Sequence, residues 1–518
     1  MLLPDLLAQS ARATPEKWAA VSADQQVTFS DLDRKSSQVG ARLRRLGLGP
    51  DQRAALLFEN SVTALVYFWG VLKTGAAVVD ISSQAAPSVI RDALQDCAPQ
   101  ALAASFHLLK RLLAGAGASA LPPLLFSAGV SEPFGGAAGT EIHSLEEICQ
   151  AEEPAAIHPS VGDRDVALIV YTSGTTGRPK GVMLSHHNLL SNIVSVNSLL
   201  RLTSEHSVLI VVPFNFIHGR FQILTHAHTG GTLFISSGFR FPTVVLEEMI
   251  KYQVSGFSGV PYHFRTLLQR TALSKTRLPH LKYVVVTGGA LSPAALRALQ
   301  AALPGVDIHI AYGQTEASPR IANLDPKDLL RKEGCVGRAV PGVRIEILGD
   351  DGSLLAPGAT GEVVVTGPNV MTGYVSGDEH RLGTIDEQGR LYTGDLGWID
   401  SHEDLYLVGR KSEMIKTAGE RIFPKEIEDV LNTHPAVEDS AVIGVKDEEL
   451  GERIIAFVAL RESQALSLSE VRQHCLQSMP FIRIPRELCA LARIPKTPSG
   501  KIHRSELLSL YQAQGDRR

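Results

Sequence analysis

A short loop of glycine, hydroxyl and lysine residues is the first feature of the sequence that could do chemistry. Residues 171–189 read YTSGTTGRPKGVMLSHHNL, and the apolar stretch before them, Val166–Tyr171, has the composition of a strand. Glycines let a backbone pass close to a ligand, and hydroxyl donors with one cation and no neighbouring carboxylate suit an oligophosphate. We therefore predict a phosphate-binding turn after a strand. Its residues are Thr172, Ser173, Gly174, Thr175, Thr176, Gly177 and Lys180.

The Walker A loop, GxxxxGK[ST], is the best-known phosphate-binding loop, and the sequence does not match it. Counted from Gly174, Pro179 stands at the second glycine position, and Gly181 stands where the magnesium-binding hydroxyl should be. A P-loop kinase is therefore excluded. Taken alone, a loop of this composition is more often a flexible connection than a binding site.

Four further elements carry groups that suit a nucleotide. Tyr312-Gly-Gln-Thr-Glu316 follows an apolar run and offers an aromatic face, a hydroxyl and a carboxylate. Tyr392-Thr-Gly-Asp395 places a carboxylate after a tight turn, where it could accept hydrogen bonds from two ribose hydroxyls, and Gly409-Arg410 and Pro498-Ser-Gly-Lys501 each supply a cation. Each element alone could be a core tyrosine, a turn aspartate or a solvated cation. Five such elements in one chain favour a single site.

Composition excludes several other classes of protein. The 518 residues are 44% hydrophobic and 20% charged with a net charge of −4, so no electrostatic reason exists to expect binding to nucleic acid or to an acidic membrane. No window is apolar enough for membrane insertion. The five cysteines are scattered without CxxC spacing, and the start of the chain lacks the basic region of a signal peptide. We expect a cytoplasmic protein without disulfides.

The elements that must position these groups alternate between strands and helices. Strands are predicted at 208–212, 232–235, 281–286 and 306–310, and helical spacing of leucines appears at 189–200 and 296–303, with Ser185 as the cap of the first helix. Such alternation predicts an α/β fold with mixed sheets and flanking helices. Ligands in such sheets bind beyond the carboxyl ends of the strands, which is where the loop at 172–180 lies.

The pattern changes in the last third of the chain. Strands at 361–365 and 405–408 predict a smaller β-rich part, and the segment after Arg410 has its own helices at 424–431 and 469–477 with strands between them, at 440–445 and 454–460. We predict a large N-terminal domain at 1–408, a hinge at 409–412 and a small α+β C-terminal domain at 413–518.

At this point the chain resembles a known family. It is similar to the adenylate-forming superfamily of acyl-CoA synthetases, adenylation domains of peptide synthetases and beetle luciferases, on the residues 171–182, the YGQTE element and the closing PKTPSGKIHR. The resemblance covers almost the whole length. It implies a large α/β domain with a β-barrel-like part, a small mobile C-terminal domain, and an AMP-forming ligase that joins a carboxylic acid to a thiol.

The resemblance also implies how the nucleotide is held. The glycine-hydroxyl turn would wrap the β- and γ-phosphates of ATP, with Lys180 at its end. Adenine would stack on Tyr312, and Asp395 would bind the ribose hydroxyls with the assistance of Arg410. The other residues implied at the nucleotide are Gly289, Ala290, Gly313 and Gln314.

In the reaction that the resemblance implies, the first step joins the carboxylate of the acid to the α-phosphorus of ATP. Charge repulsion opposes this step, because a carboxylate must approach a polyanion. Preorganised donors and cations relieve it, and losing one commonly costs ~2.7–4 kcal/mol. The resemblance implies that Thr315 binds the α-phosphate, that Glu316 holds Mg²⁺, and that Lys501 bridges the carboxylate and the phosphate. A single protein carboxylate is the expected ligand set from the chain, because Mg²⁺ keeps several waters and takes its other ligands from phosphate.

The essential lysine would then lie on a domain that moves. The resemblance implies that the small domain swings after the first step, so that Lys501 withdraws and the face around Lys416 meets the thiol. Short hinges can absorb such a change. The family usually has Asp or Lys at the hinge position occupied here by Ser412, which puts the ease of the movement in question. The implied catalytic residues are Lys501, Thr315 and Lys416.

The segment Pro213–Gly219 resembles the motif that lines the acyl pocket. Enzymes selective for α-amino acids have an aspartate where this chain has Ile217, so we do not expect an α-amino acid. Phe216 replaces a histidine, and His218 and Arg220 offer polar contacts near the mouth of the pocket. His218 could equally be a core imidazole bonded to backbone. The implied pocket residues are Phe216, Ile217, His218, Gly288 and Gly289, and they suit a medium-sized aryl or acyl acid with one polar group.

The acceptor is left open by the sequence. It could be coenzyme A or the phosphopantetheine arm of an acyl carrier protein, and Lys416 suits either. An amine or an oxygen species could instead attack the adenylate, as in a luciferase-like monooxygenase or a natural-product pathway. A non-catalytic nucleotide-binding relative is a further alternative, disfavoured by the intact set of Thr175, Glu316, Asp395 and Lys501.

Overall fold

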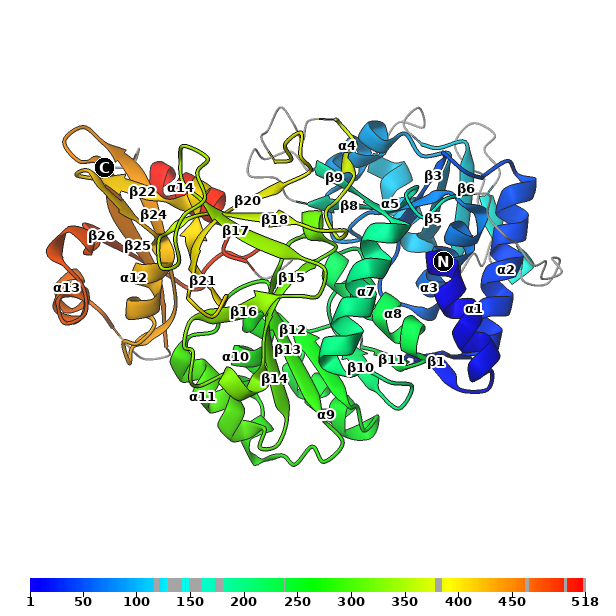
Figure 1. Ribbon diagram of the computed structural model, residues 1–518, viewed down its shortest axis with the longest axis horizontal. Coiled ribbons are helices and arrows are strands. Elements are labelled where there is room, and N and C mark those ends of the chain that lie inside the picture. Colours follow the sequence, from blue (N-terminus) through cyan, green and yellow to red (C-terminus); the bar gives the residue numbers. More distant parts are fainter. Residues whose placement is uncertain are drawn as a thin grey trace.

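The structure is a computed structural model. It describes residues 1–115, 121–128, 142–144, 146–148, 161–172, 180–236, 238–377, 384–461, 465–497 and 501–515. Two large sheets lie in the N-terminal part and a smaller one in the C-terminal part (Figure 1).

The first sheet joins a parallel half to an antiparallel half. Strands from β11 to β14 are parallel neighbours, and from β14 to β17 every pairing is antiparallel. The antiparallel half corresponds to the part that the resemblance predicts as barrel-like. The thirteen strands follow the order β17 (Arg344–Leu348), β18 (Gly361–Thr366), β20 (Leu391–Ile399), β21 (Leu405–Arg410), β16 (Cys335–Ala339), β15 (Arg320–Leu324), β14 (Asp307–Gly313), β13 (Tyr283–Thr287), β12 (Gly256–Gly259), β10 (Ser207–Ile210), β11 (Thr232–Ile235), β1 (Trp18–Val21) and β2 (Gln26–Thr28).

The second sheet has eight strands and is mostly parallel. Its order is β19 (Gly373–Tyr374), β9 (Lys180–Ser185), β8 (Val166–Thr172), β4 (Ala77–Asp80), β3 (Arg53–Leu57), β5 (Ala101–Ser105), β6 (Leu124–Ala128) and β7 (Ile142–Ser144). The apolar run before the glycine-hydroxyl turn is β8, a buried inner strand between β4 and β9, which explains why it lacks alternation.

Helices bind the two sheets together around one apolar core. That core takes in residues of both sheets and of the helices between them, including the fully buried Tyr67, Phe68 and Trp69 of α3. The N-terminal helices are α1 (Leu3–Ala13), α2 (Phe29–Arg45), α3 (Val62–Thr74), α4 (Pro87–Cys97), α5 (Phe106–Gly115), α7 (His186–Leu200), α8 (Ile217–Thr229), α9 (Pro242–Lys251), α10 (Pro261–Arg270) and α11 (Pro293–Ala302). Ser185 caps α7 as predicted, since its hydroxyl accepts a hydrogen bond from the Asn188 N–H at 3.0 Å.

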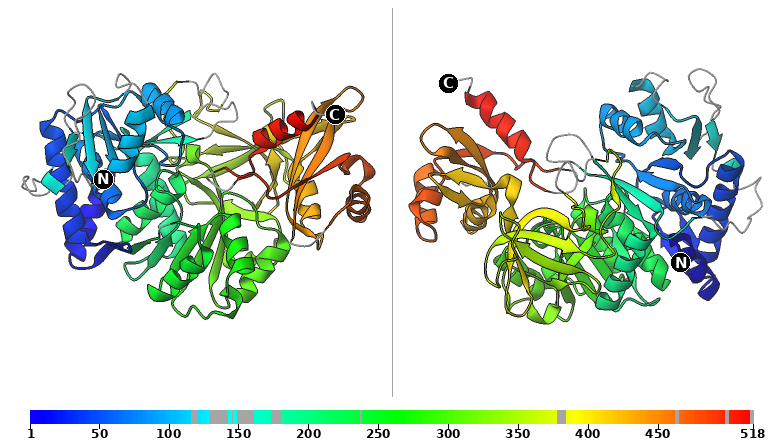
Figure 2. Two further views of the ribbon diagram at one scale, coloured as in Figure 1. Left: turned by 180° about the vertical axis from the view of Figure 1, so that it is seen from behind. Right: turned by 45° about the horizontal axis from the view of Figure 1, so that its top comes forward.

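The C-terminal part has its own sheet and its own apolar clusters. The order β23 (Glu420–Ile422), β22 (Ile415–Thr417), β25 (Gly451–Leu460), β24 (Val437–Asp447) is completed by β26 (Glu487–Leu491), which pairs with β25. Three helices accompany it: α12 (Pro424–Leu431), α13 (Leu468–Leu476) and α14 (Arg504–Gly515). Both views in Figure 2 set this part apart from the eight-stranded sheet, on the far side of the antiparallel half. The sheets and helices confirm the predicted fold class.

Two further expectations concern the chain as a whole. Across the described helices, none combines the length and the apolar character needed to cross a membrane. Cys97, Cys335, Cys475 and Cys489 form no disulfide, and Cys149 lies outside the described residues.

Candidate active site

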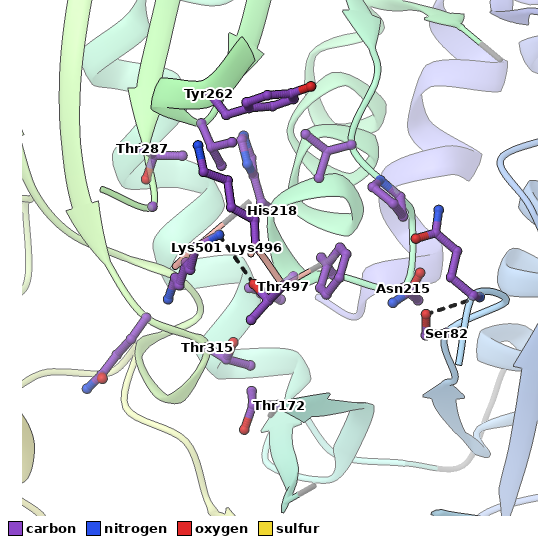
Figure 3. A pocket seen from close by; sticks show the side chains of 18 of the residues that line it. Ser82, Thr172, Asn215, His218, Tyr262, Thr287, Thr315, Lys496, Thr497 and Lys501 are labelled. Carbon is purple, nitrogen blue, oxygen red and sulfur yellow. Dashed lines mark hydrogen bonds between the residues drawn. The ribbon is translucent and has the colours of Figure 1, made fainter. Parts of the chain in front are cut away.

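The predicted elements converge on one large cleft. Its walls are the carboxyl ends of β4, β8, β10, β12, β13 and β14 on one side and residues 491–497 and Lys501 of the C-terminal part on the other (Figure 3). The cavity measures about 1960 Å³. This is larger than the roughly 300–1,000 Å³ of an ordinary ligand pocket, so it has room for more than one ligand.

Asp395, Arg410 and Tyr312 lie together at one side of the cleft: Arg410 lines it, whereas Asp395 and Tyr312 are buried and are not among its lining residues. Asp395 and Arg410 are directly paired residues on the antiparallel strands β20 and β21, and Arg410 Nε donates to Asp395 Oδ1 at 3.0 Å. The Tyr312 hydroxyl donates to the other carboxylate oxygen at 2.7 Å. Burial, together with the Asp395 charge, raises the pKa of Tyr312, so the phenol stays a donor. The structure thus links three of the predicted elements directly.

Lys501 reaches this group from the C-terminal part. Burial in the cleft lowers the pKa of its ammonium, and Arg410 lowers it further, whereas Asp395, Glu316 and Glu413 act in the opposite direction. These influences require close approach, so Lys501 shares the cleft with the predicted ribose and magnesium residues. Figure 3 shows it in the same pocket as Thr172, Thr287 and Thr315. The Lys501 N–H donates to the Thr497 hydroxyl at 3.2 Å, which fixes the backbone there.

Glu316 and Lys180 meet through Tyr374. Glu316 lies with Thr315 in the short turn η4 (Thr315–Ala317), and its Oε1 accepts a hydrogen bond from the Tyr374 hydroxyl at 3.0 Å. The Lys180 ammonium stands 5.4 Å from the centre of the Tyr374 ring. Lys180 and Thr172 are paired in register across β8 and β9 and both line the cleft.

The chain by itself offers no complete metal cage. Nowhere in the described ranges are three or more His, Cys, Asp or Glu side chains grouped to hold a metal ion. A single carboxylate at Glu316 fits an ion that arrives with a polyphosphate and takes most of its ligands from phosphate and water.

Some predicted residues are placed elsewhere or not described. Gly288, Gly313 and Gln314 line the cleft, whereas Gly289 and Ala290 are exposed and do not appear among its described lining residues. Lys416 is exposed on β22, where its N–H donates to Glu452 Oε2 at 2.6 Å, and it also lies outside the cleft wall. Ser173, Gly174, Thr175, Thr176 and Gly177 lie outside the described residues.

The acyl side is lined by Phe216, Ile217 and His218, which begin α8. His218 Nε2 is 2.7 Å from the Ser258 hydroxyl, and burial lowers the pKa of the ring to about 3, so it is neutral. It is a wall residue whose partner is a side chain, rather than a core imidazole bonded to backbone.

Arg220 does not stand at the mouth of the pocket, contrary to the expectation from its place in the motif. It is 2% exposed, donates to both oxygens of Asp80 at 2.9 and 2.5 Å, and stacks on Phe68 at 3.9 Å. Two positions along a helix rotate a side chain by about 200°, so Arg220 lies on the opposite side of α8 from His218, at the end of β4. The pair is a structural link between β4 and α8.

Sequence reasoning missed the residues that hold the two parts of the molecule together. Asp439 on β24 pairs with Lys496 at 2.5 Å and with Arg265 on α10 at 3.3 Å. Arg270 on the same helix pairs with Glu438 at 3.0 Å. Single charges spaced far apart in the chain give no signal of such pairs.

Fold and cleft together define a nucleotide-dependent enzyme of the two-domain α/β type, and comparison with known proteins agrees. The model of the AMP-binding enzyme family matches residues 7–375, and that of the AMP-binding enzyme C-terminal domain matches residues 426–501. Oxalate–CoA ligase from Arabidopsis thaliana is 30% identical over 508 residues, 97% of each chain. 4-Coumarate–CoA ligase from Pinus taeda is 32% identical over 509 residues, covering 95% of this chain and 91% of that protein.

A solved structure shows the same arrangement. O-succinylbenzoate coenzyme A synthetase from Bacillus subtilis, in complex with ATP and magnesium ion, superposes with a TM-score of 0.84 at 26% identity, covering 97% of this chain and 99% of that one. The chain belongs to the AMP-binding enzyme family. It is an AMP-forming acid–thiol ligase that uses ATP and Mg²⁺.

Proposed function

We propose that the cleft activates a carboxylic acid that is not an α-amino acid and passes the acyl group to coenzyme A, with Lys501 as the side chain that makes the first step possible. A carboxylate oxygen bonds to the α-phosphorus of ATP as the bond to pyrophosphate breaks. The sulfur of the thiol then bonds to the acyl carbon, and AMP leaves. The single observation that carries the proposal is that Lys501 lines one cleft with Arg410 and Glu316, while Arg410 is hydrogen bonded to the buried Asp395.

The residues divide the work by charge. Lys501 and Thr315 would bind the α-phosphate and the incoming carboxylate, because a cation and a hydroxyl lower the repulsion between two anions. Glu316 would hold Mg²⁺. Asp395 would accept hydrogen bonds from both ribose hydroxyls, and its two oxygens are oriented by the hydrogen bonds from Arg410 and Tyr312. Thr172 and Lys180 would meet the outer phosphates.

The second step would need a different arrangement of the C-terminal part. Lys416 is exposed on β22, away from the cleft that Lys501 enters, and both lysines belong to the same small domain. We propose that residues 409–412, where β21 ends and the turn η6 (Lys411–Glu413) begins, form the hinge that exchanges them. The relatives named above are CoA ligases, which favours coenzyme A over a carrier protein. We also propose a cytoplasmic location, which the lack of disulfides among the described cysteines favours.

Lys501→Ala tests the assignment directly. With a carboxylic acid that wild type turns over, acid-dependent pyrophosphate release should fall by at least ~100-fold, since one preorganised group that acts in the transition state is removed. The same variant should still convert chemically supplied acyl-adenylate to the thioester at a rate near that of wild type. Lys446→Ala, an exposed lysine of the same domain, is the matched control and should change neither rate. Adenylation near the wild-type rate in Lys501→Ala would show that the role is wrongly assigned.

A further inference from the structure

Arg320 is a buried arginine in the wall of the cleft. It begins β15, directly after the YGQTE element, and its side chain lines the cavity although the residue is only 6% exposed. Its backbone is held on both sides: Arg320 N–H donates to Asn192 Oδ1 at 2.9 Å, and its carbonyl accepts from Asn192 Nδ2 at 2.8 Å and from Asn369 Nδ2 at 3.1 Å. These hydrogen bonds hold the backbone of Arg320 in place, and with it the point from which the side chain extends.

The guanidinium has far fewer partners than its five N–H groups require. Among the described residues, its one side-chain hydrogen bond is from Nη1 to Asn323 Oδ1 at 3.0 Å. In the part of the chain that the structure describes, no carboxylate pairs with Arg320. Burial alone lowers its pKa, to about 10, and no acidic group raises it. At neutral pH the side chain is a cation without a counter-ion.

The same chain treats a structural arginine differently. Arg220 is as deeply buried, and it is neutralised by two hydrogen bonds to Asp80 and covered by Phe68. An unpaired buried charge costs several kcal/mol, which is why such charges are almost always paired. Arg320 thus lacks the counter-ion that a structural role requires among the described residues, and it lines a cavity in which a ligand can supply one.

The neighbours of Arg320 place it on the acyl side of the cleft. Its charge is one reason that the pKa values of His218 and His309 are lowered, to about 3 and about 4, so both rings near it are neutral. His218 is a wall residue of the acyl side beside Ser258.

We propose that the acid activated by this enzyme carries a second anionic group, a carboxylate or a phosphate, which binds Arg320 while the reacting carboxylate lies toward Lys501. The inference rests on the proposed function and names its substrate class. A guanidinium presents parallel N–H donors that match a carboxylate or a phosphate in a bidentate way, and it stays charged on binding. The bound anion would neutralise Arg320, and a neutral His218 and Ser258 add adaptable polar partners.

Specificity for the second anion is tested with matched acids. We would measure kcat/KM for pyrophosphate release with glutarate, monomethyl glutarate and 4-phosphonobutyrate, with isophthalate and its monomethyl ester, and with a broad panel of acids that lack a second anion. Wild type should prefer the doubly charged member of a pair by roughly 100-fold or more, because the neutral analogue leaves the buried cation unpaired. Comparison of glutarate with 4-phosphonobutyrate decides between carboxylate and phosphate.

The variant Arg320→Gln should bring that ratio down to near one. Arg297→Gln, which removes an exposed arginine outside the cleft, should keep the wild-type ratio. If pyrophosphate release is confined to acids without a second anion, or if Arg320→Gln keeps the ratio, the inference is wrong while the proposed function stands. If no acid of any kind releases pyrophosphate, the proposed function falls, and the inference with it.

Thermal unfolding separates a binding role from a structural one. Without ligand, Arg320→Met should melt at a temperature no lower than wild type, since it removes an uncompensated buried charge. The doubly charged acid should raise the melting temperature of wild type and not of Arg320→Met. A melting temperature several degrees below that of wild type without ligand would mean that Arg320 stabilises the fold, and would overturn the inference.

Discussion

Buried charges show at the scale of single residues which positions serve the fold and which serve the ligand. Asp80 and Arg220 are each about 2–3% exposed and neutralise each other through two hydrogen bonds between β4 and helix α8. Arg320 has no such partner among the described residues, and Lys501 forms no ion pair among them either, although it lines the cleft with Arg410 and Glu316. Pairing with a carboxylate therefore distinguishes Arg220, which serves the fold, from Arg320 and Lys501, which line the cleft.

We expect Arg220→Met to destabilise the protein by about 3–5 kcal/mol, because Asp80 would be left as a buried carboxylate without a counter-ion. The double variant Asp80→Leu/Arg220→Met should recover most of that loss, since both charges are gone. Urea denaturation followed by fluorescence measures the difference. A single variant as stable as the double variant would mean that the pair does not act as a unit.

At this scale the sequence identifies the chemistry and misses the pairings. Glu316, Asp395, Arg410 and Lys501 are found from their motifs. The structure places Glu316, Arg410 and Lys501 in one cleft, with Asp395 hydrogen bonded to Arg410. The bond from Tyr312 to Asp395 joins residues 83 positions apart, and the isolation of Arg320 is a property of everything packed around it. Neither feature leaves a local pattern in the sequence. The expectation from the Pro213–Gly219 motif for Arg220 was wrong for the same reason, because the pairing of Arg220 with Asp80 leaves no local pattern either.

At the scale of elements, the ends of the parallel strands supply one wall of the cleft, and α10 fixes the other. This helix carries Arg265 and Arg270, which pair with Asp439 and Glu438 at the start of β24. Lys496 adds a second cation to Asp439. The pairs made by Arg265 and Arg270 exist only while the C-terminal part lies against α10, so they favour the arrangement in which Lys501 enters the cleft.

Asp439→Asn should therefore slow adenylation about tenfold, a loss of ~1.4 kcal/mol, because the arrangement that contains Lys501 loses its central interdomain anion. Conversion of supplied acyl-adenylate to thioester should be unchanged or faster. Stopped-flow measurement of the two half-reactions gives both numbers. Asp429→Asn, which removes an exposed partner of Lys425 within the C-terminal part, is the matched control and should change neither rate. Equal slowing of both half-reactions by Asp439→Asn would contradict this account.

Strands and helices themselves were predictable wherever hydrophobic periodicity is strong. The helix at 424–431 coincides with α12, and the strand at 232–235 coincides with β11. The order of strands was beyond the sequence, because β1 pairs with β11 and β8 with β4 over long separations. Register and sheet order come from tertiary packing, which one sequence does not display.

At the scale of the whole molecule, the fold keeps five of the described histidines neutral far below their ordinary pKa. Burial lowers the pKa of His218 to about 3 and of His186, His226, His263 and His309 to about 4. An unfolded histidine titrates near 6.5, so below that pH the unfolded chain takes up protons that the folded chain does not. Their stabilisation is complete above pH 6.5 and is lost as the pH falls toward 4.

The melting temperature should consequently drop as the pH is lowered from 6.5 to 4.5. At pH 5, a histidine shifted to about 4 contributes a loss of about 2 kcal/mol. His226→Gln should reduce this pH dependence, because His226 is 2% exposed and hydrogen bonded to Gln222. His402→Gln, at an exposed histidine, should leave it unchanged. Identical pH profiles for wild type and His226→Gln would refute the assignment.

The central claim is that a carboxylate oxygen bonds to the α-phosphorus of ATP in the cleft that Lys501 completes. The most direct measurement uses an acid labelled with ¹⁸O in its carboxylate, turned over with Mg·ATP and coenzyme A, and mass spectrometry of the products. We predict one ¹⁸O atom in AMP and none in pyrophosphate. Unlabelled AMP, or formation of ADP with labelled phosphate, would contradict the claim.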